Sequence, residues 1–203
     1  MLMNQVLLAT RNEKKRLELA NILGDKGIEV LSLQNYPEIP DVEETGETFA
    51  ENALLKARTV CQHTGLITLA DDSGLEVDFI GGQPGVYSAR FAGKAHDDQL
   101  NNQKLLALLS GVPSVARTAR FRCVIAIVTP EGKEYLTSGQ VEGFIGEGSV
   151  GEKGFGYDPL FIPAGFDHTF GELSSEVKNR ISHRGRALTL AASILKEVAG
   201  DRA

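Results

Sequence analysis

Short apolar runs alternate with segments of helical periodicity along the first half of the chain, and this alternation limits the fold to a few classes. The pattern predicts strands at 5–9, 28–33, 66–70, 75–80, 120–128 and 134–145, and helices at 13–23, 49–64, 97–110, 174–181 and 186–198. Pro130 and Gly132 form the turn of a hairpin between the last two strands. Strands and helices that alternate before a hairpin predict an α/β fold with a mixed sheet.

The most clearly marked helix follows Thr48. Thr48 and Glu51 have the spacing of a capping box, in which each side chain bonds to the other residue's backbone N–H. Phe49 and Ala53 begin one apolar face, and Gly65 is a typical residue to end the helix.

Length and charge exclude several classes of protein. The 203 residues are enough for one sizeable core, so we expect a single domain over 1–203, with room for two lobes. The net charge of −6 argues against a nucleic-acid binder, which needs a basic face. Residues 1–4 are not a basic segment before an apolar stretch, and no apolar run of about 18 residues follows, so we expect no signal peptide, no membrane span and a cytoplasmic location. Cys61 and Cys123 lie in apolar contexts and are expected to be buried, reduced thiols.

The apolar run 66–70 leads directly into Asp71 and Asp72, followed by Ser73 and a glycine. We predict that the strand ends here, where the carboxyl ends of strands in α/β sheets line a ligand crevice. Adjacent carboxylates favour a hard metal ion, because a cation offsets their repulsion. A solvated turn is the alternative. The acidic loop at Glu43 and Glu44 offers a further ligand, or is simply a solvated loop.

Two further groups of residues suit the ends of a nucleotide. Thr10, Asn12 and Lys15 lie at a strand-to-helix turn, where free N–H groups and the helix dipole favour phosphate; Lys56 is a second candidate cation, and both lysines are equally compatible with a solvated face.

The other group lies in the second half of the chain. A glycine-bounded aromatic pair at 154–159 allows a flat base to stack, although core filling by Phe155 and Tyr157 is the competing account. Lys178 and the segment 182–185 supply donors for a base edge, or cap adjacent helices.

The glycines at 146–151 formally fit the dinucleotide fingerprint, but the residues that follow cannot open the helix that this fingerprint requires. No phosphate loop of the G-x-x-x-x-G-K-[ST] type, no H-E-x-x-H and no G-x-S-x-G is present.

Together these segments resemble the non-canonical purine nucleoside triphosphate pyrophosphatases, the inosine and xanthosine triphosphatase family. Six motifs occur in the family's order over nearly the whole chain. They are T-x-N-x-x-K at Thr10 to Lys15, E-E-T-G-x-T-F-x-E-N-A-x-x-K-A at Glu43 to Ala57, A-D-D-S-G-L at Ala70 to Leu75, P-G-V-Y-S-A-R at Pro84 to Arg90, G-F-G-Y-D-P at Gly154 to Pro159, and S-H-R-G at Ser182 to Gly185.

The resemblance implies an α/β fold with a long central mixed sheet flanked by helices, two lobes with the active-site cleft between them, and a homodimer. It implies Mg²⁺ as cofactor, Asp72 as the catalytic carboxylate and a metal ligand, Glu43 as a further ligand, and Asp71 close by. The implied triphosphate contacts are Thr10, Asn12, Lys15, Lys56 and Ser73. The implied base pocket contains Phe155, stacked on the purine, with Gly156, Tyr157, Asp158, Lys178, His183 and Arg184. Members of this family often carry glycine after the threonine, whereas Arg11 here either alters the phosphate contacts or is an extra ligand.

The implied reaction is hydrolysis of ITP, dITP and XTP to the nucleoside monophosphate and pyrophosphate, which clears deaminated purines from the nucleotide pool. A metal-activated water would attack the α-phosphorus, with Asp72 as proton acceptor. Donors at Lys178 or Arg184 would favour a purine with oxygen at C6 over adenine. Two rival hypotheses are a pyrophosphatase for modified pyrimidine or ordinary nucleotides and a nucleotide-binding regulator without catalysis.

Overall fold

The computed structural model describes residues 5–24, 27–93 and 97–200 of the chain, and the predictions for 1–4 lie outside these ranges. The strands are β1 (Gln5–Leu8), β2 (Glu29–Ser32), β3 (Thr68–Val77), β4 (Thr118–Val128), β5 (Glu134–Ile145) and β6 (Phe161–Pro163). The α-helices are α1 (Glu13–Gly24), α2 (Phe49–Thr64), α3 (Asp98–Leu108), α4 (Ser175–Ile181) and α5 (His183–Gly200). Short 3₁₀ helices are η1 (Leu33–Asn35), η2 (Asp78–Ile80), η3 (Gly85–Arg90) and η4 (Ser114–Ala116).

The strands form one mixed sheet in the order β2-β1-β3-β4-β5-β6. β1 pairs in parallel with β2 and β3, and β5 pairs antiparallel with β6. β4 and β5 are neighbours joined by a turn in which the Thr129 N–H donates to the Lys133 carbonyl at 3.0 Å. So short a connection between paired strands makes a hairpin. The predicted α/β fold with a mixed sheet is confirmed.

The chain divides into two compact units. Unit 1 contains Met1–Asp72, Cys123–Gly139 and Arg184–Ala203, and unit 2 contains Ser73–Arg122 and Gln140–His183. The active-site cleft expected between two lobes stays a prediction. Within the described ranges, none of the helices combines the length and the apolar character that crossing a membrane requires.

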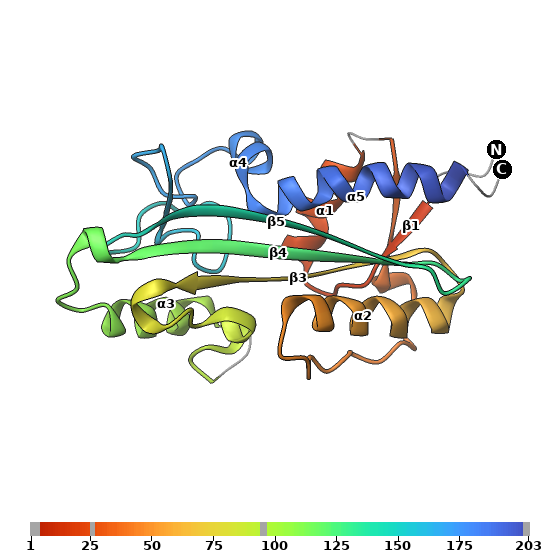
Figure 1. Cartoon of the computed structure of the whole chain (residues 1–203), viewed down its shortest axis with the longest axis horizontal. Helices are drawn as coiled ribbons and strands as arrows, with labels where there is room; N and C mark the ends of the chain where they lie inside the picture. The colour runs from red at the N-terminus through yellow and green to blue at the C-terminus, as the bar shows by residue number, and fades with distance from the viewer. Residues whose placement is uncertain (1–4, 25–26, 94–96, 201–203) are drawn as a thin grey trace. The chain divides into compact units, whose positions relative to one another are not determined.

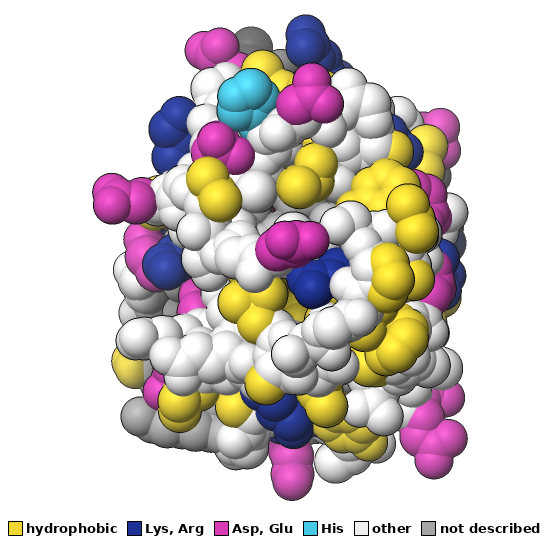
Figure 2. Space-filling view, turned by 90° about the vertical axis from the view of Figure 1, so that its left-hand side faces the viewer, with side chains coloured by type: hydrophobic (Ala, Val, Ile, Leu, Met, Phe, Trp, Pro, Cys, Tyr) yellow, Lys and Arg dark blue, Asp and Glu magenta, His cyan; other side chains and the backbone are white. Residues whose placement is uncertain are grey.

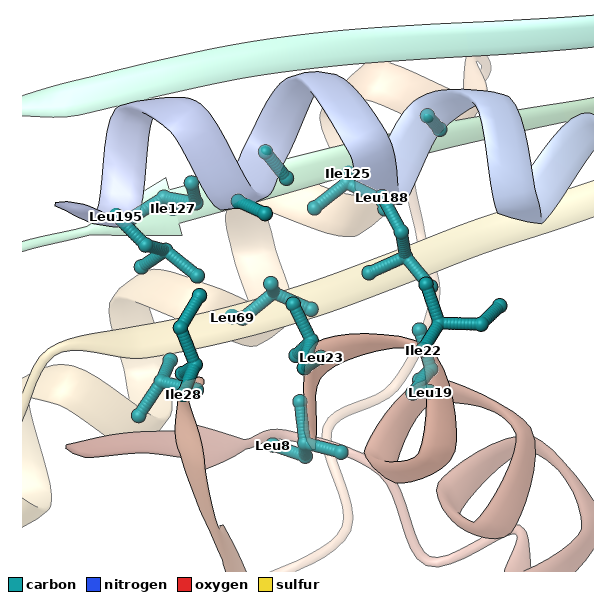
Figure 3. Close-up of a cluster of buried hydrophobic side chains, with 14 of the residues drawn as sticks. Leu8, Leu19, Ile22, Leu23, Ile28, Leu69, Ile125, Ile127, Leu188 and Leu195 are labelled. Carbon is teal, nitrogen blue, oxygen red and sulfur yellow. The ribbon is translucent and has the colours of Figure 1, made fainter. Parts of the chain in front are cut away.

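Unit 1 has helices on both faces of its strands. In Figure 1, α1 and α5 lie on one side of the strands and α2 on the other. Leu188 and Leu195 of α5 point toward Leu23 of α1 and Leu69 of β3 (Figure 3), and all four side chains are buried. On the opposite face, α2 packs Ala53 and its neighbours against a second apolar cluster that includes Ala70. The capping box of Thr48 and Glu51 and the left-handed Gly65 cap of α2 are confirmed.

Unit 2 has an aromatic core. The ring of Phe121 meets that of Phe161 edge-on at 4.8 Å between centroids, and Phe170 packs against both. Buried residues of α3 and β3, among them Leu105 and Leu75, complete this cluster.

On the face drawn in Figure 2, acidic and basic side chains are interspersed rather than gathered into one basic patch. That face therefore lacks the uniform positive surface that a general nucleic-acid binder presents.

The prediction that a strand ends at Asp71 is wrong. β3 runs without interruption from Thr68 to Val77, and the separate strand predicted at 75–80 is its second half, followed by η2. The physical reason is that apolar side chains continue to alternate past the aspartates, with Leu75 and Val77 fully buried in unit 2. Tertiary burial on both sides stabilises an extended chain through residues whose local preference is a turn.

Two smaller differences concern the second half of the chain. The last helix begins at His183 rather than at 186, because Ser182 is extended and ends α4, and the helix then includes Gly185. The short strand β6 was not predicted, since three residues carry too little periodicity to be detected.

As predicted, the glycines at 146–151 lead into turns and not into a helix, which removes the dinucleotide interpretation. Cys61 and Cys123 are buried thiols, as predicted, and burial raises the pKa of Cys123 to about 12.

Leu188 offers a test of the packing in Figure 3, because its side chain is fully buried between α5 and the sheet. We expect Leu188→Ala to lower the free energy of unfolding by about 2–5 kcal/mol through lost apolar contact and a residual cavity. Leu190→Ala is the matched control, since Leu190 lies in the same helix with 54% of its surface exposed. Urea denaturation measures both variants, and equal losses would contradict this packing.

Candidate active site

Asp71 and Asp72 point to opposite faces of the sheet, because successive side chains alternate along a strand. Asp71 lies on the face of Leu69, which packs with α1 and α5, and Asp72 lies on the face of Ala70, which packs with α2. Two consecutive carboxylates are therefore accommodated without being pressed against each other. Each one meets a different set of partners.

Asp71 is compensated by cations from two helices. Its Oδ2 atom lies 3.1 Å from Lys15 Nζ of α1 and 3.5 Å from Arg184 Nε of α5. Arg184 is 2% exposed and also forms an ion pair with Glu18 of α1. Burial alone would raise the pKa of Asp71, but Lys15 and Arg184 outweigh it and hold this pKa well below its usual range. Asp71 is thus a charged residue that its surroundings are built to keep charged.

Asp72 is less well compensated. Its Oδ2 atom accepts a hydrogen bond from Asn52 Nδ2 at 3.1 Å, and its Oδ1 atom lies 3.7 Å from Lys56 Nζ. Lys56 itself bonds to the Glu44 carboxylate and to the Asp71 carbonyl, each at 2.7 Å. Burial, assisted by the charge of Glu44, raises the pKa of Asp72 despite the attraction of Lys56 and Lys15. A buried carboxylate with a raised pKa is suited to bind a cation or to accept a proton.

β1 and β3 are parallel neighbours in which Leu8 pairs with Leu69. The loop that follows β1 therefore lies beside Asp71 and Asp72, which follow Leu69 in β3. Asn12 caps α1 by accepting from the Lys15 N–H at 3.1 Å, and the Thr10 hydroxyl accepts from the Asn12 N–H at 3.2 Å. Arg11 turns to the acidic loop, where it pairs with Asp41 at 2.6 Å and donates to the Ile39 carbonyl. Thr10, Asn12 and Lys15 thus share one turn beside Asp71, whereas the Arg11 guanidinium is engaged elsewhere.

Of the two glutamates in the acidic loop, Glu44 pairs with Lys56 beside Asp72. Glu44 is partly buried and holds Lys56, while Glu43 is exposed. The metal-binding role of Glu43 stays a prediction, and so does that of Asp71. Among the described residues, no group of three or more histidine, cysteine, aspartate or glutamate side chains is placed to hold a metal ion.

A second candidate group lies in unit 2, around Phe155. The Asp158 Oδ2 atom accepts from the Phe155 N–H and from Lys178 Nζ, each at 2.7 Å. Lys178 is buried, and its Nζ atom also lies 5.1 Å from the centre of the half-buried Phe155 ring. A partly accessible ring beside a fixed cation donor is suited to stack on a base and to donate to its edge.

The other predicted base-pocket residues have different surroundings. Tyr157 is a core residue, because its ring is buried and its hydroxyl donates to the Ser88 carbonyl at 2.9 Å. The His183 ring stacks on Phe121 at 4.8 Å. Ser73 is partly exposed in β3, directly after Asp72. Arg184 belongs to unit 1, with Asp71 and Glu18, although the resemblance assigns it to the base pocket.

The sequence assigned no role to Asn52 or Glu18, and it offered Glu44 only as part of an acidic loop that could supply a metal ligand, not as the partner of Lys56. Asn52 is fully buried and joins the acidic loop to Asp72, since its Oδ1 atom accepts from the Gly46 N–H at 2.7 Å. One signal was available: Asn52 is a polar residue on the apolar face of α2, three residues after Phe49 and four before Lys56. Glu18 gave no comparable signal, because charged residues are common on helices.

Comparison with known proteins identifies the family of this chain. A model of the Ham1 family matches residues 6–194, so the chain belongs to the Ham1 family. A dITP/XTP pyrophosphatase of Desulforamulus reducens is 53% identical, with 96% of each chain covered. A dITP/XTP pyrophosphatase of Listeria innocua is 50% identical, with 97% of each chain covered.

Solved structures of this family have the same fold. The Ham1 protein of Staphylococcus aureus matches with a TM-score of 0.84 at 39% identity, over 95% of this chain and 98% of that one. A nucleoside-triphosphatase, or dITP/XTP pyrophosphatase, of Mycobacterium abscessus matches with a TM-score of 0.75 at 48% identity, over 92% and 98%.

The pKa of Asp71 is lowered and that of Asp72 is raised, so the same substitution is expected to affect stability by different amounts at the two positions. Asp71→Asn should lower the free energy of unfolding by about 3–5 kcal/mol, because it leaves the partly buried Lys15 and the buried Arg184 without their shared anion. Asp72→Asn should leave stability within about 1 kcal/mol of wild type, since burial already disfavours the charged form and the amide keeps a polar contact with Asn52. Chemical denaturation at neutral pH compares the two, and a larger loss at Asp72 would refute this assignment.

Proposed function

We propose that this chain hydrolyses non-canonical purine nucleoside triphosphates, with ITP, dITP and XTP as substrates and the nucleoside monophosphate and pyrophosphate as products. The observation that carries the proposal is the buried, incompletely compensated Asp72 beside Lys56 and Glu44. Relatives named dITP/XTP pyrophosphatase match over nearly their whole length and support the choice of substrate. A nucleotide-binding regulator would have no need to keep a carboxylate in this state.

The triphosphate is assigned to unit 1. Thr10 and Asn12 form the turn that opens α1, where the helix dipole favours an anion. Lys15 and Lys56 place two ammonium groups on either side of the Asp71–Asp72 segment, since Lys15 bonds the Asp71 carboxylate and Lys56 the Asp71 carbonyl. These cations offset negative charge on a leaving pyrophosphate.

Mg²⁺ is the cofactor we propose, and the donor set fits it. Mg²⁺ is commonly held by one or two carboxylates together with phosphate oxygens and water. Asp72 and Glu44 supply two carboxylates that both lie within 4 Å of Lys56 Nζ, and the pKa of Asp72 is raised by burial and by the charge of Glu44, which a bound cation would offset. Bound Mg²⁺ would supply charge neutralisation for the phosphates. Glu43 remains the ligand implied by the resemblance.

Asp72 is the residue we assign to the proton. A water near the α-phosphorus must lose a proton as it attacks, and the buried Asp72 carboxylate is the general base that we assign to accept it. Asn52 donates to one oxygen of Asp72 and so orients the other oxygen. Because the Gly46 N–H in turn donates to Asn52, the amide of Asn52 cannot rotate freely.

The base is assigned to the group around Phe155 in unit 2. The Phe155 ring is the stacking surface, and Lys178 beside it is a donor for the oxygen at C6 of hypoxanthine or xanthine. Adenine would place its amino group, also a donor, against the same ammonium, and the mismatch leaves polar groups unpaired. The chain passes directly from unit 1 to unit 2 between Asp72 and Ser73, and back to unit 1 between His183 and Arg184.

Hydrolysis assays with ITP, dITP, XTP, GTP and ATP, with and without Mg²⁺, test this function. We expect Mg²⁺-dependent release of pyrophosphate from the first three, with ITP favoured over ATP by several orders of magnitude, because a donor mismatch can discriminate by about 10⁴. Asp72→Asn should reduce turnover by about 10²–10⁴ while the protein remains folded. Stepwise release of orthophosphate, ATP hydrolysis as fast as that of ITP, or an active Asp72→Asn would each overturn the proposal. A pyrimidine preference would favour the rival substrate class.

We also propose that the protein acts as a cytoplasmic homodimer, as the resemblance implies. The large exposed side chains Phe79 and Tyr87, in η2 and η3, offer apolar area for such a contact. Light scattering after size exclusion should give a mass near twice 21.9 kDa. A monomer at micromolar concentration would contradict the dimer but not the activity.

A further inference from the structure

Helix α3 lies outside the six motifs that carry the family resemblance, yet two of its side chains reach the loop that contains Phe155. Asp98 and Asn102 are four residues apart and therefore lie on the same face of the helix. Both are partly buried. Neither residue is needed to explain the fold of α3, whose cap is the side chain of Asp97.

The two side chains hold both polar backbone groups of Gly156. The Asp98 Oδ2 atom accepts from the Gly156 N–H at 2.8 Å, and the Asn102 Nδ2 atom donates to the Gly156 carbonyl at 3.0 Å. A carbonyl oxygen can only accept, so Asn102 must present its nitrogen and not its oxygen. One helix thus fixes one residue of the loop from both its donor and its acceptor side.

This loop needs an external restraint because of its composition. Gly154 and Gly156 have φ angles of 75° and 62°, in the left-handed region that glycine enters easily. A Cβ atom at Gly154 would lie 2.1 Å from Asp158 Oδ2, so the close approach of the backbone to Asp158 requires glycine. Glycine leaves the unrestrained backbone with many conformations, and Phe155 lies between these two glycines.

The other restraints on this loop act on either side of Gly156. Asp158 fixes the Phe155 N–H, and Ser88 fixes the Tyr157 hydroxyl. Burial together with the nearby charge of Asp98 raises the pKa of Tyr157 above its usual range, which places the Asp98 carboxylate in the electrostatic surroundings of that ring. The Gly156 N–H belongs to the peptide group that joins it to Phe155, and its carbonyl to the one that joins it to Tyr157, so the two bonds from α3 orient both peptide groups beside Phe155.

We infer that Asp98 and Asn102 are positioning residues for nucleobase selection: by clamping the Gly156 peptide from α3, they fix the Phe155 ring next to Lys178. This inference rests on the function proposed above. Discrimination between a C6 oxygen and a C6 amino group requires a donor held at a defined place relative to the stacked base. A loop freed from α3 still offers Phe155 and Lys178, but in several arrangements, some of which tolerate adenine.

The test compares kcat and KM for ITP and ATP in the wild type and in Asp98→Ala, Asn102→Ala and Asn102→Asp, with thermal unfolding of each protein. We expect KM for ITP to rise about tenfold in each variant, as expected for loss of one hydrogen bond, with a smaller change in kcat. The ITP-to-ATP ratio of kcat/KM should fall by about the same factor. Asn102→Asp preserves volume but places an acceptor against the Gly156 carbonyl, so it tests the clamp even if an alanine variant fails to fold.

Three control variants separate positioning from stability. Asp98→Asn keeps an oxygen that accepts from Gly156 and should restore the wild-type ratio. Asp97→Ala removes the cap of α3, in which Asp97 accepts from the Leu100 N–H, and should lower the melting temperature without changing the ratio. Gln103→Ala, at an exposed position of the same helix, should change neither.

The outcomes distinguish this inference from the proposed function. If the wild type hydrolyses ITP and the clamp variants keep both its KM and its ratio, the inference is overturned and the function stands. If Asp97→Ala lowers the ratio as much as Asp98→Ala, the effect is one of helix stability and the inference also fails. If the wild type does not hydrolyse six-oxo purine triphosphates, the proposed function fails and the inference that rests on it fails too.

Discussion

The alternation of side chains along β3 is the constraint on which the site in unit 1 depends. Because the strand continues through Asp71 and Asp72, the pleat directs one carboxylate toward α1 and α5 and the other toward α2. A turn at this position, as the local sequence suggests, would leave both carboxylates in solvent with no defined partners. The apolar residues on either side make the strand continuous, so packing creates two different electrostatic environments from two identical, adjacent residues.

These two environments have different consequences. Asp71, buried with Lys15 and Arg184, has a lowered pKa and contributes to holding α1 and α5 on the sheet. Asp72 has a raised pKa, because its burial is only partly offset by Lys56 and because Glu44 adds negative charge. Replacing a well-compensated buried charge destabilises a protein, whereas a poorly compensated one is retained at a cost in stability. That cost is typical of groups that bind a cation or transfer a proton.

In unit 2, hydrogen bonds to a loop hold the candidate base site, whereas in unit 1 the alternation along β3 positions the aspartates. Its candidate base site is a glycine-containing loop whose backbone is held by Asp158 within the loop and by Asp98 and Asn102 of α3. Lys178 of α4 donates to the Asp158 carboxylate. Glycine permits the close backbone approach that Gly154 makes to Asp158, and the surrounding hydrogen bonds offset the conformational freedom that glycine brings. Lys178 is buried by the same contacts, so the donor and the ring are fixed together.

The sequence alone determined the α/β class, the helix capped by Thr48 and the hairpin of β4 and β5, because these follow from periodicity, capping and short-range spacing. It also named the two candidate residue groups, around Asp72 and around Phe155. It did not determine that β3 passes through the aspartates, nor that Asn52, Glu44 and Glu18 bond to them or to their cations. Residues 12 to 166 positions apart form these contacts, from Glu44 with Lys56 to Glu18 with Arg184. Partners so distant leave no periodic signal, and the pKa of each carboxylate depends on which of them tertiary packing brings within reach.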